Sequence, residues 1–193
     1  MHSSVDRDLL RLTSNHEEAD IDAHMCGIER LIVVCRDTDV LIVLLQVAAQ
    51  LPKEVWFMCG ISSQPKFIAV HRIDLADSVR SNIATFHAVT GCDSVSQFYG
   101  IGKTMAWKVF NEFPYLLQRL GCCDLTADAL QEVEEVVCRL YLTRSSAVNV
   151  NDVRYLLYQK GTKYPENLPP TAALHQHIRR AHYQAEILQH TTT

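Results

Sequence analysis

Five acidic side chains occur in three short groups that could together bind metal ions. They are Glu18, Asp20, Asp37, Asp39 and Asp93. Carboxylates about 4 Å apart repel by about 1 kcal/mol per pair in water and by more at lower dielectric, so a cluster of them needs cations. Hard oxygen ligands select Mg²⁺ or Mn²⁺. Two such ions can activate a water and stabilise the leaving oxygen of a phosphodiester, if the three groups meet at one site.

A glycine-containing segment further along the chain suits phosphate. Gly100-Ile101-Gly102 is followed at once by Lys103 and an amphipathic run, which predicts a tight turn that opens a helix. The backbone N–H groups at the start of such a helix favour anions. The residues expected to hold such a phosphate are Gly100, Ile101, Gly102, Lys103 and Lys108. For the two lysines, a simple solvated helix face is the alternative interpretation.

The acids at 37 and 39 come directly after the most apolar part of the chain. Residues 31–35 are a continuous β-branched and apolar run, which predicts a central parallel strand covered on both faces. Open α/β sheets bind ligands outside the carboxyl ends of their strands, where Asp37 and Asp39 are expected to lie. The alternative is that one of them is the N-cap of the next helix.

The first acidic pair lies on a helix predicted over residues 15–26. Ser14 and Glu17 have capping-box spacing, which marks the start of this helix. On a regular helix Glu18 and Asp20 point to nearly opposite sides, whereas Glu17 and Asp20 share a face. Glu18 therefore converges with Asp20 only in an irregular first turn, and Glu17 is kept as a lower-ranked ligand. Acids near a helix N-terminus are also favourable without any metal.

The hydrophobic pattern predicts the remaining elements. Helices are expected over 40–50, 72–80, 82–90, 103–113, 115–120, 126–142, 151–159 and 171–188, and a hairpin of edge strands over 55–58 and 67–70. In the helix over 103–113, the residues expected to face inward are Met105, Ala106, Val109 and Phe110, and those expected to face outward are Lys103 and Lys108. Asp93 follows the helix over 82–90, and taken alone it is typical of a turn.

Composition limits the class of protein. The chain has 193 residues, a net charge of -4 and seven cysteines without a Cys-x-x-Cys pair. No apolar run is long enough to cross a bilayer, and the cysteines are typical of reduced core residues. A soluble intracellular protein, nuclear or cytoplasmic, is expected, with no membrane partner. Any contact with DNA must come from local basic patches, because no global positive charge attracts it. His175, His177 and His182 are expected on a polar helix surface and not at a metal.

The acids and the glycine turn, taken together, resemble the flap endonuclease (XPG-type, PIN-like) nucleases. In that family Glu-x-acid on a helix, Asp-x-Asp after a strand and Gly-Cys/Ser-Asp before a Gly-Ile-Gly turn occur in this order. The resemblance implies an α/β fold with a mostly parallel PIN-like sheet flanked by helices. It covers 14–113, with a helix-hairpin-helix region over about 82–113, and leaves 114–193 as a C-terminal helical extension. It also implies two Mg²⁺ or Mn²⁺ ions and a nucleic-acid partner, more readily DNA than RNA.

The family's catalytic domain begins with a strand that bears a further Asp. Residues 1–13 are too short to supply it, so the sheet is expected to lack its first strands and the metal site at least one ligand. Two functions follow as hypotheses. One is a metal-dependent, structure-specific nuclease, and the other is a catalytically inactive nucleic-acid-binding or interaction module that keeps the fold.

Overall fold

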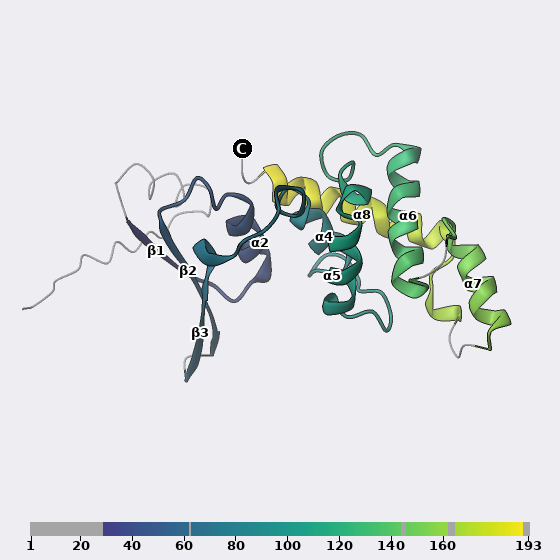
Figure 1. Ribbon diagram of the computed structural model, residues 1–193, viewed down its shortest axis with the longest axis horizontal. Coiled ribbons are helices and arrows are strands. Elements are labelled where there is room, and N and C mark those ends of the chain that lie inside the picture. The colour runs from purple at the N-terminus through teal and green to yellow at the C-terminus, as the bar shows by residue number, and fades with distance from the viewer. Residues whose placement is uncertain (1–28, 62, 144–145, 162–164, 191–193) are drawn as a thin grey trace, which may run out of the picture.

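The computed structural model describes residues 29–61, 63–143, 146–161 and 165–190. In this part of the chain an α/β arrangement combines one small sheet with seven α-helices. The sheet lies at one end of the molecule and helices α6 and α7 lie at the other (Figure 1). Helix α8, Thr171–His190, runs from the helical end back toward the sheet. None of the described helices is long and apolar enough to cross a bilayer.

The sheet has three strands among the described residues, in the order β1-β2-β3. Strand β1, Arg30–Val34, pairs in parallel with β2, Glu54–Ile61, which pairs antiparallel with β3, Gln64–Ala69. The predicted hairpin over 55–58 and 67–70 is confirmed. A mostly parallel sheet is not what these residues form, because one of the two pairings is antiparallel.

The position of β1 differs from the prediction of a central strand covered on both faces. It lies at an edge of the described sheet, and Ile32 and Val34 are 46% and 66% exposed. On the other face of the sheet, Val55 and Phe57 are buried and pack in one cluster with Leu44. The strand is therefore covered on one face only. An unbroken apolar run does not show which of its residues are exposed, so the sequence could not predict this.

Helix α2, Thr38–Gln46, forms the crossover between the parallel strands β1 and β2. It ends several residues before the predicted boundary at 50, with Val47 as its C-cap. Its apolar side buries Val43, Leu44 and Leu45. Asp37 and Asp39 lie at the start of this helix, so the packing of α2 determines the position of both side chains.

The middle of the chain is helical, as predicted, but in shorter pieces. A 3₁₀ turn covers Val70–Arg72, and helices α3, α4 and α5 cover Asp77–Arg80, Ile83–Val89 and Lys103–Glu112. Every residue of α4 is buried. Helix α4 therefore forms the centre of the fold, packed against α2 and α8.

The C-terminal part follows three of the predicted helices closely, but the helix predicted over 115–120 is a short 3₁₀ turn. Helices α6 and α7 cover Ala127–Tyr141 and Val150–Gln159, and 3₁₀ turns cover Pro114–Leu117 and Pro165–Asn167. A single hydrophobic cluster joins residues of α4, α5, α6, α7 and α8. The helical extension thus shares its core with the segment before it. The six described cysteines are free, with Cys138 buried and Cys122 and Cys123 exposed.

Candidate functional site

The structure describes some of the predicted acidic residues but not all of them. Glu18 and Asp20, with the lower-ranked Glu17, lie outside the described residues. Asp37 is the N-cap of α2, where its Oδ1 accepts the backbone N–H of Asp39 at 2.9 Å. The capping interpretation of Asp37 is therefore confirmed, and its role as a metal ligand stays a prediction.

Asp39 is connected through a histidine to the glycine turn. Its Oδ1 lies 2.6 Å from Nε2 of His87 on α4, and Nδ1 of His87 lies 2.8 Å from Nζ of Lys103 on α5. An ammonium group has only donors, so Lys103 donates to Nδ1 and the imidazole donates from Nε2 to Asp39. The acid after β1 and the lysine after Gly102, 64 positions apart in sequence, thus meet at one site.

The electrostatics of this chain of groups follow from burial. The side chain of His87 is 4% exposed. Burial, followed by the neighbouring charge of Lys103, lowers the pKa of His87, and the hydrogen bond to Asp39 opposes this effect. Burial also lowers the pKa of Lys103, against the charges of Cys92 and Asp39. Both shifts favour the neutral forms of the two bases.

Helix α8 and the segment after α4 complete the surroundings of Asp39. Gln184 donates from Nε2 to Oδ2 of Asp39 at 3.4 Å, and Ser94 donates to Oε1 of Gln184 at 2.8 Å. The Sγ of Cys92 lies 3.4 Å from the hydroxyl of Ser94. Helices α2, α4, α5 and α8 and the segment after α4 therefore hold the site together, and the packing of α8 on α4 is a condition for its geometry.

Asp93 lies in a tight turn at the edge of this site. Cys92 and Val95 exchange backbone hydrogen bonds around it, and its side chain is exposed. Gly91 has a φ of +106°, and a Cβ there would come within 2.4 Å of the side chain of Gln97. Both the backbone conformation and the close packing of this turn thus require glycine at position 91. The role of Asp93 as a metal ligand remains a prediction.

The Gly100-Ile101-Gly102 segment forms the turn that was predicted to open α5. Gly100 has a φ of +73°, and a Cβ at Gly100 or Gly102 would meet nothing within 4 Å. No described side chain caps the first turn of α5. The phenol of Tyr141 donates to the carbonyl of Tyr99 at 3.0 Å, and burial raises the pKa of Tyr141 to about 12, which keeps it a donor at neutral pH. The turn is therefore open to solvent on one side and anchored by α6 on the other.

The faces of α5 differ in part from the prediction. Ala106, Val109 and Phe110 are buried as expected, but Met105 is 39% exposed. Lys108 is exposed as predicted. Lys103 is exposed as a residue, yet its ammonium group contacts His87. It was predicted to point outward because position 103 lies on the polar side of the helix, and the sequence does not show that α4 lies beside that position.

Among the described ranges, no three His, Cys, Asp or Glu side chains are grouped so that they could hold a metal ion. Two carboxylates are placed to act as metal ligands at the site. That of Asp37 caps a helix, and that of Asp39 already binds His87 and Gln184. These residues alone do not fit a two-metal centre.

The three histidines of α8 that were expected on a polar surface, His175, His177 and His182, have separate structural contacts. His175 lies 3.3 Å from the carboxylate of Glu134, and the ring of His182 accepts the backbone N–H of Gly121 at 3.0 Å. His177 is buried, donates from Nε2 to the carbonyl of Val89, and has its pKa lowered by burial. The expectation of a polar surface is wrong for His177, since its ring lies in the core.

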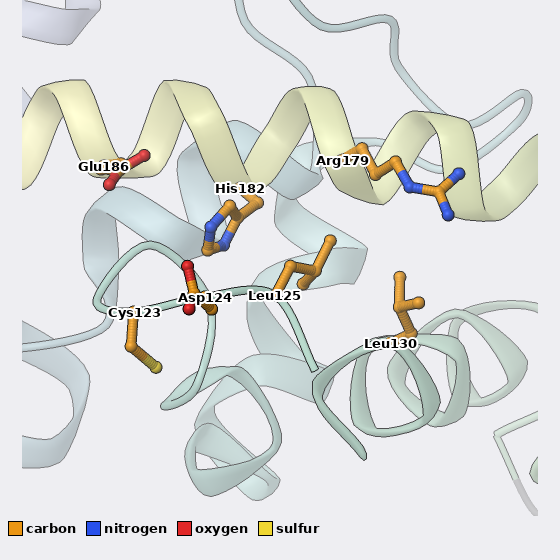
Figure 2. A pocket seen from close by; sticks show the side chains of 7 residues that line it. All are labelled: Cys123, Asp124, Leu125, Leu130, Arg179, His182 and Glu186. Carbon is orange, nitrogen blue, oxygen red and sulfur yellow. The ribbon is translucent and has the colours of Figure 1, made fainter. Parts of the chain in front are cut away.

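A pocket of about 470 Å³ lies elsewhere, between α8, α6 and the segment that connects the Pro114–Leu117 turn with α6. Figure 2 shows His182 of α8 and Asp124 pointing toward one another across it. Its lining residues are Cys123, Asp124, Leu125, Leu130, Arg179, His182 and Glu186. None of the predicted site residues lines this pocket.

Sequence reasoning missed His87 and Gln184 as members of the site. His87 lies within an apolar helical run, where a single histidine is usually a satisfied core residue. Its distance of 48 residues from Asp39 gives no local pattern that could pair them. Gln184, on the last helix and 145 positions from Asp39, has no sequence pattern that predicts this contact. Comparison with models of protein families, with curated proteins and with solved structures gives no match.

Proposed function

We propose that the chain is a nucleic-acid-binding module that holds a phosphate backbone at the Gly100-Ile101-Gly102 turn. The observation that carries this proposal is the junction between Asp39, His87 and Lys103, which joins the acids after β1 to an open, uncapped helix start. Two of the three motifs behind the resemblance to flap-endonuclease-type nucleases thereby meet in space.

Backbone groups are the main contacts in this proposal. The first N–H groups of a helix have no intrahelical partner and favour an anion. Gly100 and Gly102 leave room beside them, because no atom lies within 4 Å of a Cβ at either position. Thr104 and Lys108 lie on the exposed side of this helix. Contacts of this kind position a strand without reading its bases.

Metal-dependent hydrolysis of the bound strand is the second candidate. It is favoured by the placement of Asp37 and Asp39 at the carboxyl end of β1, where both charges act on His87. Mg²⁺ or Mn²⁺ would then be held by Asp37 and Asp39 with Asp93, Glu18 and Asp20. Such ions would activate a water toward the phosphodiester.

One experiment separates the two candidates. Fluorescence anisotropy with single-stranded, hairpin and flap DNA and with single-stranded RNA measures affinity in EDTA, Mg²⁺ or Mn²⁺, and a denaturing gel measures cleavage of the same samples. The binding module predicts affinity that survives EDTA, weakens with salt and comes without cleavage. Cleavage only with Mg²⁺ or Mn²⁺, lost in Asp39→Asn, would establish the nuclease. Absence of binding in every condition would contradict both candidates.

A further inference from the structure

We propose that Cys122 and Cys123 form an oxidation site, at which hydrogen peroxide joins the two neighbouring thiols in a disulfide. The pair lies between the Pro114–Leu117 turn and α6. Neither residue belongs to the proposed nucleic-acid site, so this inference does not depend on the proposed function. It rests on the contact between the two sulfurs, on their exposure and on the pocket beside them.

The two thiols are already in contact. The Sγ atoms of Cys122 and Cys123 lie 3.7 Å apart. When peroxide oxidises a cysteine to a sulfenic acid, a second thiol within reach converts it to a disulfide, whereas an isolated sulfenic acid can be oxidised further and irreversibly. At this position the next residue in the chain supplies the second thiol. Oxidation of the pair should therefore stop at a reversible product.

Solvent reaches both residues of the pair. Cys122 and Cys123 are exposed, whereas Cys138 on the following helix is buried. Burial also raises the pKa of Cys138 to about 12, so its thiol stays protonated at neutral pH. Since the thiolate is the reactive form of cysteine, peroxide should oxidise the pair and leave Cys138 unchanged. Cys138 is thus an unreactive reference within the same chain.

The surroundings give the two thiols different roles. Cys123 lines the pocket of about 470 Å³ beside α8 (Figure 2), which admits a small oxidant. The thiol of Cys122 donates to the carbonyl of Gln118 at 3.4 Å. Burial, followed by the hydrogen bond with Cys123, raises the pKa of Cys122. Cys123 is therefore the thiol that attacks the peroxide, and Cys122 is the thiol that resolves the product.

The reaction balances with hydrogen peroxide as the oxidant. The thiolate of Cys123 attacks one peroxide oxygen, an S–O bond forms, and the O–O bond breaks. The departing hydroxide takes up the proton of the Cys123 thiol, which gives one water and a sulfenic acid. Cys122 then attacks the sulfenic sulfur, the S–S bond forms, and the departing hydroxide takes up the proton of Cys122. Two thiols and one peroxide thus give a disulfide and two waters.

The backbone beside this pair contacts two helices. The N–H of Gly121 donates to Nδ1 of His182 on α8 at 3.0 Å, and the carbonyl of Leu120 accepts the hydroxyl of Thr85 on α4 at 3.1 Å. A disulfide between adjacent residues closes a small ring through the peptide bond that joins them. The backbone of Cys122 must adjust to this ring, so oxidation should change the surroundings of His182.

Oxidation followed by peptide mapping tests the proposal directly. The whole chain is treated with hydrogen peroxide near pH 7, remaining thiols are alkylated in denaturant, and peptides are mapped by tandem mass spectrometry. The expected product is a disulfide between Cys122 and Cys123 of one chain, which dithiothreitol returns to thiols. It should form at least tenfold faster than any oxidation product of Cys138.

Single substitutions separate the two roles. In Cys122→Ser the sulfenic acid on Cys123 has no resolving thiol, so dimedone should capture it there. In Cys123→Ser the labelling of Cys122 by dimedone should be at least tenfold lower. Cys59→Ala, which removes a half-buried cysteine of β2, should leave the disulfide unchanged.

A spectroscopic measurement tests the effect on α8. Ring signals of His182 and His175 are recorded by NMR before and after oxidation of the wild-type chain. His175 contacts Glu134 of α6 and not the backbone beside the two cysteines. The signals of His182 should shift and those of His175 should stay in place, and dithiothreitol should restore the original spectrum.

Other results would overturn the proposal or one of its parts. Thiols at 122 and 123 that survive while Cys35, Cys59 or Cys92 is oxidised would overturn it. Sulfinic acid in place of the disulfide, or a disulfide between two chains on a non-reducing gel, would do the same. Faster dimedone labelling of Cys122 than of Cys123 would overturn the two roles. An unchanged His182 spectrum after oxidation would overturn the effect on α8.

Discussion

At the scale of single residues, His87 determines the charge of the site. It is buried, accepts a hydrogen bond from Lys103 and donates one to Asp39. A protonated ring would have two donors and would face the ammonium of Lys103 with a like charge. The neutral ring is therefore the form that fits both partners.

This arrangement predicts how stability depends on pH. The pKa of His87 is lowered in the folded chain from its ordinary value of 6.5, so the unfolded chain binds the proton more readily. The free energy of unfolding should therefore fall as pH drops below about 6.5, toward the folded pKa. Urea titrations at a series of pH values test this for wild type and His87→Gln. His177 has the same direction of shift, so His177→Gln is the matched comparison. An unchanged slope in His87→Gln would contradict the assignment.

Asp37 allows capping to be separated from metal binding. Asp37→Ala removes the acceptor for the N–H of Asp39 and should lower the free energy of unfolding by about 1 kcal/mol. Asp37→Asn keeps an acceptor and should restore most of that loss. If Asp37 also binds a cation, both variants should weaken Mn²⁺ binding measured by calorimetry. A stability loss in the Asn variant as large as in the Ala variant would argue against the cap.

At the scale of elements, one buried acid connects three helices. Glu134 of α6 is 1% exposed, and its Oε1 accepts the backbone N–H of Val150 at the start of α7 and the hydroxyl of Thr171 at the start of α8. Its Oε2 lies 3.3 Å from the ring of His175. A carboxylate at two helix N-termini is also favoured by their dipoles.

Removal of this acid should have a large effect. Glu134→Ala leaves buried donors without an acceptor and should lower the free energy of unfolding by about 3 kcal/mol. Glu135→Ala, one position along the same helix and paired with Arg139 one turn further on, should cost less than about 1 kcal/mol. Thermal and urea unfolding measure both. Equal losses in the two variants would contradict the connecting role of Glu134.

The elements were predicted better than their surroundings. Helical periodicity and caps such as Thr126 before α6 are local signals, so helices α5 to α8 lie close to their predicted ranges. The position of β1 at an edge depends on which strands pair, and the apolar run over 31–35 does not contain that information. For the same reason the sequence predicted Asp39 and Lys103 as site residues but not the His87 that joins them. The ring of His87 is positioned by the packing of α4 against α2 and α8.

At the scale of the whole molecule, the site depends on how α8 returns from the helical end toward the sheet (Figure 1). Gln46 donates to the carbonyl of Leu188, and Gln184 donates to Asp39. Gly121 packs against α8, where a Cβ would come within 2.8 Å of the Cβ of Ala185. The packing of α8 thus connects the hydrophobic core of the helical end to Asp39.

A glycine pair tests this connection. Gly121 and Gly161 have φ values of +84° and +63°, but a Cβ at Gly161 would meet nothing within 4 Å. Gly161→Ala should therefore cost only backbone strain, about 1 kcal/mol. Gly121→Ala should cost about 2–4 kcal/mol, because overpacking adds to the strain. Chemical-shift changes at Gln184 and Asp39 should accompany Gly121→Ala alone, and their absence would contradict the coupling between the two ends.

The measurement that tests the central claim most directly compares two substitutions at Gly102. Its backbone has no positive φ and a Cβ would meet nothing within 4 Å, so both Gly102→Ala and Gly102→Glu should fold as the wild type does. Anisotropy titrations with single-stranded DNA in EDTA should give similar affinities for wild type and Gly102→Ala and at least a tenfold loss for Gly102→Glu, because a carboxylate would then stand where the phosphate binds. Equal affinity for all three chains would show that nucleic acid, if bound at all, is held elsewhere.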